Sequence, residues 1–497
     1  MVLPALVALT VGLGPILRGS WDLWAQSLFH LATAAGLTLW LASRVLAGYV
    51  PLPSSRNLLW ASALLLLGAA AVWTSPVHAL AVPEWYNFLN ALWMFPAIAA
   101  LSKDERFYVD EAVRAAAWVL MVLAFYQRLV LGDARPESAL VNVNVYAGAV
   151  LMLLPLALEK RDWLLAAGLG VSLWWASSVG AWLGLFAAFV LTGRWRREAR
   201  FWIGLSGALV CLVVIYSKFQ SPDVLNRWEW WKAAAAMAFD RPLTGYGPGS
   251  YAHVLPAYRE AGGLGTLYAH QYFLQTAAEY GIPFAILWFG GLWHCLWKGG
   301  SYKRFGALAA LIHSLWDWPL SMPSNLWLFS YFAASSISEG SRGVNIPSRL
   351  KVPVCALALA AGAMVTSRAW SLWAADRAKA VAAVAMAADR SQEARAAAEE
   401  ALRRRPEDPE PHLILARLWL AEASSSKEHR SDLERAAARL ERAAHLDPFR
   451  AATWTELATT YRRLGRPEKA EQTLARGARR CVRLRKALER ARAGPRP

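Results

Sequence analysis

Long apolar runs follow one another through the first three quarters of this chain. A helix that crosses a bilayer needs roughly 20 mostly apolar residues, and in lipid every backbone polar group must be paired inside the segment. The runs lie near residues 2–17, 24–47, 58–75, 85–101, 112–131, 141–158, 163–176, 177–192, 200–216, 283–297, 304–318, 325–339 and 352–367. The sequence therefore predicts an all-α fold, a polytopic transmembrane helix bundle of about 12–13 spans over residues 1–367.

The first apolar run is expected to remain in the protein. Residues 1–17 have no basic stretch ahead of the run and no cleavage site of small residues, which favours a membrane span over a signal peptide. The four cysteines show no paired spacing, so we expect neither a disulfide framework nor a cysteine metal site.

The basic residues indicate the orientation of the bundle. Lys and Arg gather in the loops that follow even-numbered spans, for example Arg194, Arg196 and Arg197, whereas loops after odd-numbered spans hold few. Basic loops stay in the cytoplasm, so the large loop 217–282 and everything after the last span are expected in the periplasm of a Gram-negative inner membrane. The formal charge of +17 thus follows membrane loops, and no nucleic-acid partner is expected.

The composition changes at about residue 368. From there Ala, Arg, Glu and Leu recur with helical periodicity, which predicts a soluble helical domain over residues 368–497. Tyr461, Leu464, Gly465 and Ala470 recur at the spacing of a tetratricopeptide repeat, well matched over 451–484 and less well over 411–448. Such repeats form helix pairs that either bind a protein partner or cap the membrane domain.

A polar island interrupts the apolar sequence between residues 226 and 284. It holds ionisable residues where the neighbouring segments hold few, including Arg227, Arg241, Arg259, His270 and Glu279. Ionisable residues gathered at one place in a membrane protein indicate a functional site. The glycine-rich run 245–249 allows a tight backbone that can approach a ligand closely, although a plain loop has the same composition.

Local signals within the island predict its helices. An Ala-rich helix ends at Asp240, and a second helix begins near His270 and ends at Gly281, with Pro283 starting the next span. His270 then lies near a helix N-terminus at the outer membrane surface. Further along, His313 and Asp317 are four residues apart, which would place them on one helix face as either pocket residues or an interhelical hydrogen-bonding pair.

These residues, in this order, resemble the O-antigen ligase and O-antigen polymerase superfamily of bacterial envelope glycosyltransferases. Family ligases carry an R-x-x-x-L motif and an H-[N/S/Q]-x9-G-x-x-[G/T/Y] motif. Here His270-Gln271 is followed after nine residues by Gly281, with Phe284 at the last motif position. Arg227 matches the arginine, but Trp231 replaces the leucine. The resemblance implies transfer of a glycan from undecaprenyl diphosphate to a lipid A core, a protein or another glycan, with no metal and no other cofactor.

That chemistry assigns roles to the island. Arginine binds phosphate oxygens through two parallel hydrogen bonds, so Arg227 is the first candidate diphosphate ligand, followed by Arg259 and Arg241. Histidine accepts protons near neutral pH, so His270 is the candidate base, with diphosphate binding as its alternative role. The remaining candidate substrate-binding residues are Tyr251 as a sugar-stacking ring, Glu279 as a loop-orienting or arginine-pairing carboxylate, and Asp317 and His313 at the pocket floor.

Other functions stay open at the level of sequence. Ligase and polymerase share the same arginine and histidine chemistry, so the sequence does not separate an inverting ligase from a polymerase. A multispan transporter would need paired charges near the bilayer midplane and related halves, and neither is seen. A scaffold reading would make the repeats a binding site for a protein partner, with membrane lipids around the bundle.

Overall fold

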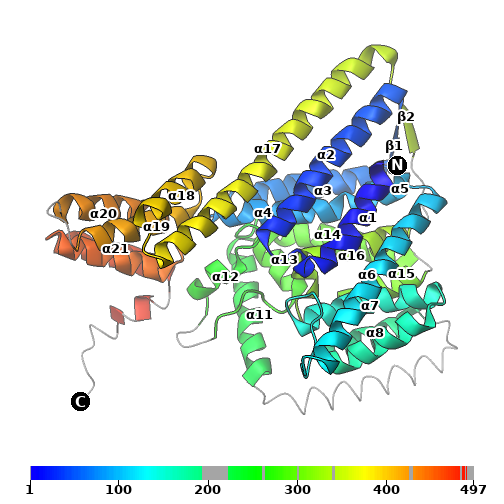
Figure 1. Ribbon diagram of the computed structural model, residues 1–497, viewed down its shortest axis with the longest axis horizontal. Helices are drawn as coiled ribbons and strands as arrows, with labels where there is room; N and C mark the ends of the chain where they lie inside the picture. The colour runs from blue at the N-terminus through cyan, green and yellow to red at the C-terminus, as the bar shows by residue number, and fades with distance from the viewer. Residues whose placement is uncertain are drawn as a thin grey trace.

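The structure is a computed structural model that describes residues 2–192, 222–259, 264–298, 301–337, 342–424 and 429–481, together with 484–486 and 488–489. It is nearly all-α, as predicted. A bundle of apolar helices occupies one part of the molecule, and a smaller group of amphipathic helices lies beside it (Figure 1). The predicted span at 200–216 lies outside the described residues.

The helices of the bundle overlap the predicted apolar runs, although the run 85–101 is divided between two helices and the run 352–367 lies inside a much longer one. They are α1 (Val2–Ile16), α2 (Leu23–Ala47), α3 (Ser55–Trp73), α4 (His78–Leu92), α5 (Met94–Ala100), α6 (Lys103–Leu129), α7 (Val143–Glu159), α8 (Trp163–Ala176), α9 (Val179–Thr192), α14 (Ile282–Lys298), α15 (Tyr302–His313), α16 (Pro323–Ser335) and α17 (Ser348–Ala387). Among the described helices, α2, α3 and α17 are long and apolar enough to cross a membrane, and several shorter ones are also apolar. Leu66 on α3 and Leu357 on α17 are 74% and 71% exposed, as expected of side chains that face lipid.

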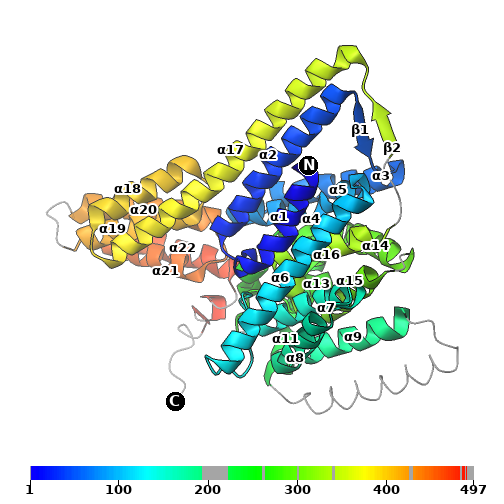
Figure 2. The same cartoon turned by 45° about the vertical axis from the view of Figure 1, so that its right-hand side comes forward.

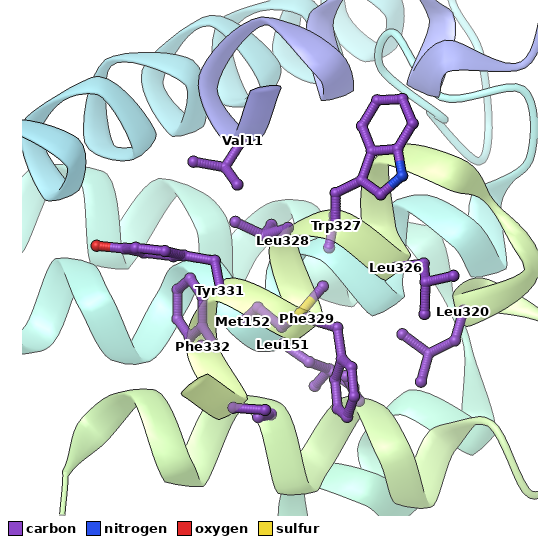
Figure 3. Packing of buried hydrophobic residues seen from close by; sticks show 14 of the residues in the cluster. Val11, Leu151, Met152, Leu320, Leu326, Trp327, Leu328, Phe329, Tyr331 and Phe332 are labelled. Atoms are coloured by element: carbon purple, nitrogen blue, oxygen red, sulfur yellow. The ribbon is translucent and has the colours of Figure 1, made fainter. Parts of the chain in front are cut away.

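Helix α16 forms the centre of the bundle. Its side chains from Pro323 to Ala334 are buried on every face, which identifies a core helix. Figure 3 shows Trp327, Leu328 and Phe329 of α16 packed between Val11 of α1 and Met152 of α7. The turn η3 (Pro319–Ser321), which follows Asp317, packs against this core helix.

A long helix joins the bundle to the repeat domain. α17 runs beside α2 in both views (Figures 1 and 2), and a Cβ on Gly362 would lie 1.9 Å from Oγ1 of Thr38, so the two backbones approach closely at this glycine. β1 (Tyr49–Leu52) follows α2, and β2 (Arg342–Asn345) precedes α17. The two strands pair antiparallel, so the loops that contain them lie on the same side of the bundle. The predicted domain boundary at residue 367 falls inside α17, which continues without a break to Ala387.

The repeat domain consists of antiparallel helices. They are α18 (Ser391–Arg404), α19 (Pro409–Glu422), α20 (His429–Leu446), α21 (Ala451–Arg463) and α22 (Pro467–Arg480). Leu413, Leu440, Leu457 and Tyr461 are buried between these helices, which gives the domain its own hydrophobic core.

The polar island folds into short helices at the end of the bundle that faces the repeat domain. They are α11 (Pro222–Asp240), α12 (Tyr251–Val254), the 3-10 turn η2 (Leu255–Ala257) and α13 (Tyr272–Tyr280), with further 3-10 turns η1 (Arg18–Ser20) and η3 (Pro319–Ser321) nearby. α13 begins after Gln271, whose side-chain oxygen accepts a hydrogen bond from the Leu274 N–H, and it ends at Gly281 with φ 88°. The predicted helix boundaries of the island are therefore confirmed.

Candidate active site

Three charged side chains from distant parts of the chain meet at the island. Arg227 comes from α11, His270 directly precedes α13, and Asp317 lies between α15 and η3. His270 Nδ1 is 3.0 Å from Oδ1 of Asp317, and the Arg227 guanidinium is 3.3 Å from its Oδ2. Arg227 also donates a hydrogen bond to the carbonyl of Trp316. We call Arg227, His270 and Asp317 the charged cluster.

The position of His270 is fixed on several sides. Its backbone is in the left-handed region at φ 53°, the Trp230 ring stacks on the imidazole at 5.0 Å between centroids, and Trp231 Nε1 donates to the His270 carbonyl at 3.3 Å. Trp231 occupies the position where the family motif has leucine, and it holds the backbone of the candidate base. When Nδ1–H donates to Asp317, Nε2 carries the lone pair that can accept a proton.

Asp317 is suited to orient a base and hold an arginine. The residue is 3% exposed. Burial raises the pKa of its carboxyl, but the hydrogen bond from His270 and the charge of Arg227 outweigh burial, so the pKa lies below the ordinary value of 3.8. Asp317 is thus an anion at neutral pH, with one oxygen toward His270 and the other toward Arg227.

The predicted pairing of His313 with Asp317 on one helix face is wrong. α15 ends at His313, and Asp317 lies in the turn that follows. Residues 314–316 form a turn after α15, and Pro319 begins the 3-10 turn η3. His313 Nε2 lies 3.4 Å from the Ser178 hydroxyl inside the bundle, while Asp317 contacts His270 and Arg227.

The other predicted arginines lie in contacts apart from the charged cluster. Arg241 donates to the Thr74 carbonyl at 3.2 Å and lies over the Tyr246 ring at 4.6 Å. The Arg259 guanidinium lies beside Gly265. The structure therefore brings Arg227 together with the candidate base, and it gives Arg241 a role in holding the island.

Two further candidate residues, Tyr251 and Glu279, are buried. Tyr251 is fully buried and donates from its hydroxyl to the Trp230 carbonyl, so its ring is not available to stack on a sugar. Glu279 accepts hydrogen bonds from the Tyr251 N–H and from Gln275, which are the contacts expected of a loop-orienting carboxylate. Burial is the main cause that raises the pKa of Glu279 to about 8, and the nearby Glu84 carboxylate adds to it.

The glycine-rich run packs against the protein itself. Gly245, Gly247 and Gly249 all have positive φ. A Cβ on Gly245 would lie 2.5 Å from the Glu279 carbonyl carbon, and one on Gly249 would lie 2.6 Å from Cγ of Glu84. The prediction that these glycines serve a close approach to ligand is therefore corrected, because they let the loop approach α13 and α4.

A polar cavity beneath the island was not predicted from sequence. It has a volume of about 260 Å³ and is lined by residues that include Gln26, Glu84, Asn87, Tyr268 and Glu279. We call it the inner cavity. The available signal was the presence of Gln26 and Asn87 within apolar runs, where polar side chains are costly unless they serve a function.

The fold and the site together define a multi-pass helical membrane protein with a charged site at one end and an attached helical-repeat domain. Residues 164–289 match the family model described as O-antigen ligase, and residues 429–480 match a tetratricopeptide repeat. The predicted resemblance to the O-antigen ligase family is thus confirmed over this segment, and the predicted tetratricopeptide repeat is confirmed in the C-terminal helices. No curated protein and no solved structure matches the chain. Arg227 and His270 lie inside the matched segment, and Asp317 lies beyond it.

Proposed function

We propose that this protein transfers a glycan from undecaprenyl diphosphate to an acceptor hydroxyl at the periplasmic face of the inner membrane, as an O-antigen ligase. The observation that carries the proposal is the charged cluster, in which Asp317 joins the candidate base to the candidate phosphate ligand. The O-antigen ligase match over both motif residues supports it.

His270 acts as the general base in this proposal. Its Nε2 accepts the proton of the acceptor hydroxyl, and the acceptor oxygen forms a bond to the anomeric carbon of the donor sugar. The bond from that carbon to the diphosphate oxygen breaks on the opposite side, so the configuration inverts. The imidazolium that forms is stabilised by the Asp317 carboxylate 3.0 Å from Nδ1.

Arg227 stabilises the leaving group. Undecaprenyl diphosphate departs with the bonding electron pair, and the negative charge on its oxygens needs fixed donors. A guanidinium carries five N–H donors, and the contacts to Asp317 and Trp316 leave others for phosphate. The Arg227 side chain is 28% exposed, so a lipid-linked diphosphate can reach it. This assignment requires no metal ion.

The orientation rests on the basic loops and on the contacts between segments. β1 and β2 join two loops that are both predicted to be cytoplasmic. The polar island and the repeat domain, both predicted to be periplasmic, contact each other through His253 and Asp447. These two groupings support one consistent topology in which the charged cluster faces a flipped, lipid-linked donor.

The envelope glycans of a deletion strain test the proposal and separate it from its alternative. A ligase deletion gives lipid A core without attached polymer, whereas a polymerase deletion gives core that carries a single repeat. Complementation with wild-type protein restores the profile, and Arg227→Gln or His270→Asn does not. An unchanged glycan profile in the deletion strain would refute both readings.

A further inference from the structure

The inner cavity lies on the far side of an aromatic wall from the charged cluster. Tyr268 stacks on Trp318 at 4.4 Å between centroids, and the Trp318 edge faces His270 at 6.4 Å. Tyr268 lines the cavity, and Trp318 directly follows Asp317. A molecule in the inner cavity is thus separated from the candidate base by two aromatic rings.

Among the described residues, the polar lining of the inner cavity leaves one carboxylate oxygen free, on Glu84. The side-chain amide of Asn87 donates hydrogen bonds to Gln26 Oε1 at 3.0 Å and to Glu84 Oε2 at 3.3 Å. Gln26 in turn donates to the Trp21 carbonyl at 2.9 Å. Within the described part of the chain, Glu84 Oε1 receives no hydrogen bond. The lining therefore favours a ligand that supplies hydrogen-bond donors.

A second cavity continues from the first. This junction cavity has a volume of about 240 Å³, and the two cavities share Trp21, Gln26, Glu84, Gly249 and His253. Its opposite wall comes from α17 and the repeat domain, through Lys379, Arg405, Asp408, Glu410, Leu446 and Asp447. Glu84 thus faces both spaces.

The repeat domain is fixed against the island at this place. Arg405, 4% exposed at its side chain, donates to the Ala79 carbonyl at 2.6 Å. His253 Nδ1 is 3.2 Å from Oδ2 of Asp447, and the buried Phe449 ring lies 6.0 Å from Tyr246 within the small core of the island. Through these contacts the repeat domain forms one wall of the junction cavity.

We propose that the inner and junction cavities form one cleft that binds neutral sugar rings of a glycan, with Glu84 accepting hydrogen bonds from sugar hydroxyls and the repeat domain forming the outer wall. Aromatic rings such as Trp21 and Tyr268 beside acceptor oxygens suit a sugar, which has apolar faces and hydroxyl donors. A diphosphate fits the inner cavity poorly, because no lysine or arginine is among the described residues that line it, whereas Glu84 is. The diphosphate is therefore assigned to Arg227, outside the cleft.

This inference rests on the proposed function for the source of the glycan, and a binding measurement keeps the two separable. Full-length protein in detergent is titrated calorimetrically with two soluble probes: the lipid-free repeat-unit oligosaccharide of the donor, and the core oligosaccharide released from lipid A. Binding of the first probe identifies the cleft as a donor subsite, and binding of the second identifies it as an acceptor subsite.

Glu84→Gln keeps the shape of the side chain and removes its charge. It is expected to weaken affinity for the bound probe roughly tenfold to 150-fold, the range for a hydrogen bond to a charged group. Glu137→Gln, which changes an exposed carboxylate away from the cleft, leaves affinity unchanged. His270→Asn is expected to abolish transfer while binding of the probe persists.

A larger side chain at Leu446 tests whether the repeat domain forms a wall of the cleft. Leu446→Trp fills part of the junction cavity and is expected to weaken oligosaccharide binding at least tenfold, whereas Leu446→Ala leaves it within threefold. The cleft is refuted if neither probe binds, or if Glu84→Gln and Leu446→Trp, with unchanged thermal transitions, bind as wild type does. Sugar binding without any glycan transfer by the wild type would instead refute the proposed function and leave the cleft standing.

Discussion

Replacement of Asp317 by asparagine should reduce glycan transfer without unfolding the protein. The carboxylate is buried, lies 3.0 Å from His270 Nδ1 and lies 3.3 Å from Arg227. A hydrogen bond to a charged group contributes about 1.5–3 kcal/mol, and 1.4 kcal/mol is tenfold in rate. Loss of the His270 contact alone therefore predicts a decrease in kcat of roughly tenfold to 150-fold. Because Asp317 acts through His270, we regard it as a positioning residue.

The assay is release of undecaprenyl diphosphate from a lipid-linked glycan by purified protein in proteoliposomes. Asp240→Asn is the matched control, because Asp240 lies in the same island but accepts hydrogen bonds from Tyr246 and Tyr258. In a His270→Asn background, Asp317→Asn should lower kcat little further, since the base that it orients is already gone. Two results would contradict this reasoning. One is a wild-type rate for Asp317→Asn. The other is a double variant whose loss in kcat equals the product of the losses in the two single variants.

Three further predictions concern stability. The pKa of Glu279 is raised to about 8 in the folded protein, so the stability that protonated Glu279 contributes is fully present below its ordinary pKa of 4.5 and is lost as pH rises through 8. Thermal melts should therefore show Tm falling between these two pH values, and Glu279→Gln should reduce that fall. Gly281→Ala should cost about 1–3 kcal/mol, because φ is 88° and the new Cβ would lie 2.4 Å from the Leu243 carbonyl oxygen; an unchanged Tm would contradict this. Asp110→Asn should lower the free energy of unfolding by about 3–5 kcal/mol, because it breaks the buried 2.6 Å ion pair with Lys303. An unchanged Tm in the same melts would contradict this.

Local signals made much of the fold predictable. The apolar runs located the helices of the bundle, and the run from His270 to Pro283 located α13 and the start of α14, because glycine and proline constrain the backbone within a few residues. The repeat spacing at 451–484 similarly predicted the last helix pair, α21 and α22.

The charged cluster was predicted only in its parts. His270 and Asp317 are 47 residues apart and Arg227 and Asp317 are 90 apart, so their contacts depend on how the bundle packs. The expected placement of His313 and Asp317 on one helix face was wrong, because it assumed helical spacing beyond His313, where α15 ends. A helix pattern constrains neighbours on one segment, whereas tertiary packing selects partners across segments.

Burial explains the remaining differences. Tyr251 and the glycine-rich run have the composition of a ligand loop, but their surroundings come from α4, α11 and α13, which the local sequence does not specify. The inner cavity was missed for the same reason, since Gln26, Glu84 and Gln275 come from three separate helices and become neighbours only in the folded protein.

The most direct test of the charged cluster is the rate of undecaprenyl diphosphate release by His270→Asn beside that of His445→Asn, which changes an exposed histidine on the repeat domain. General base catalysis contributes roughly 10²–10⁴-fold, so His270→Asn should lose at least a hundredfold in turnover while His445→Asn matches the wild type. A folded His270→Asn protein that releases undecaprenyl diphosphate within threefold of the wild-type rate would contradict the assignment of this site.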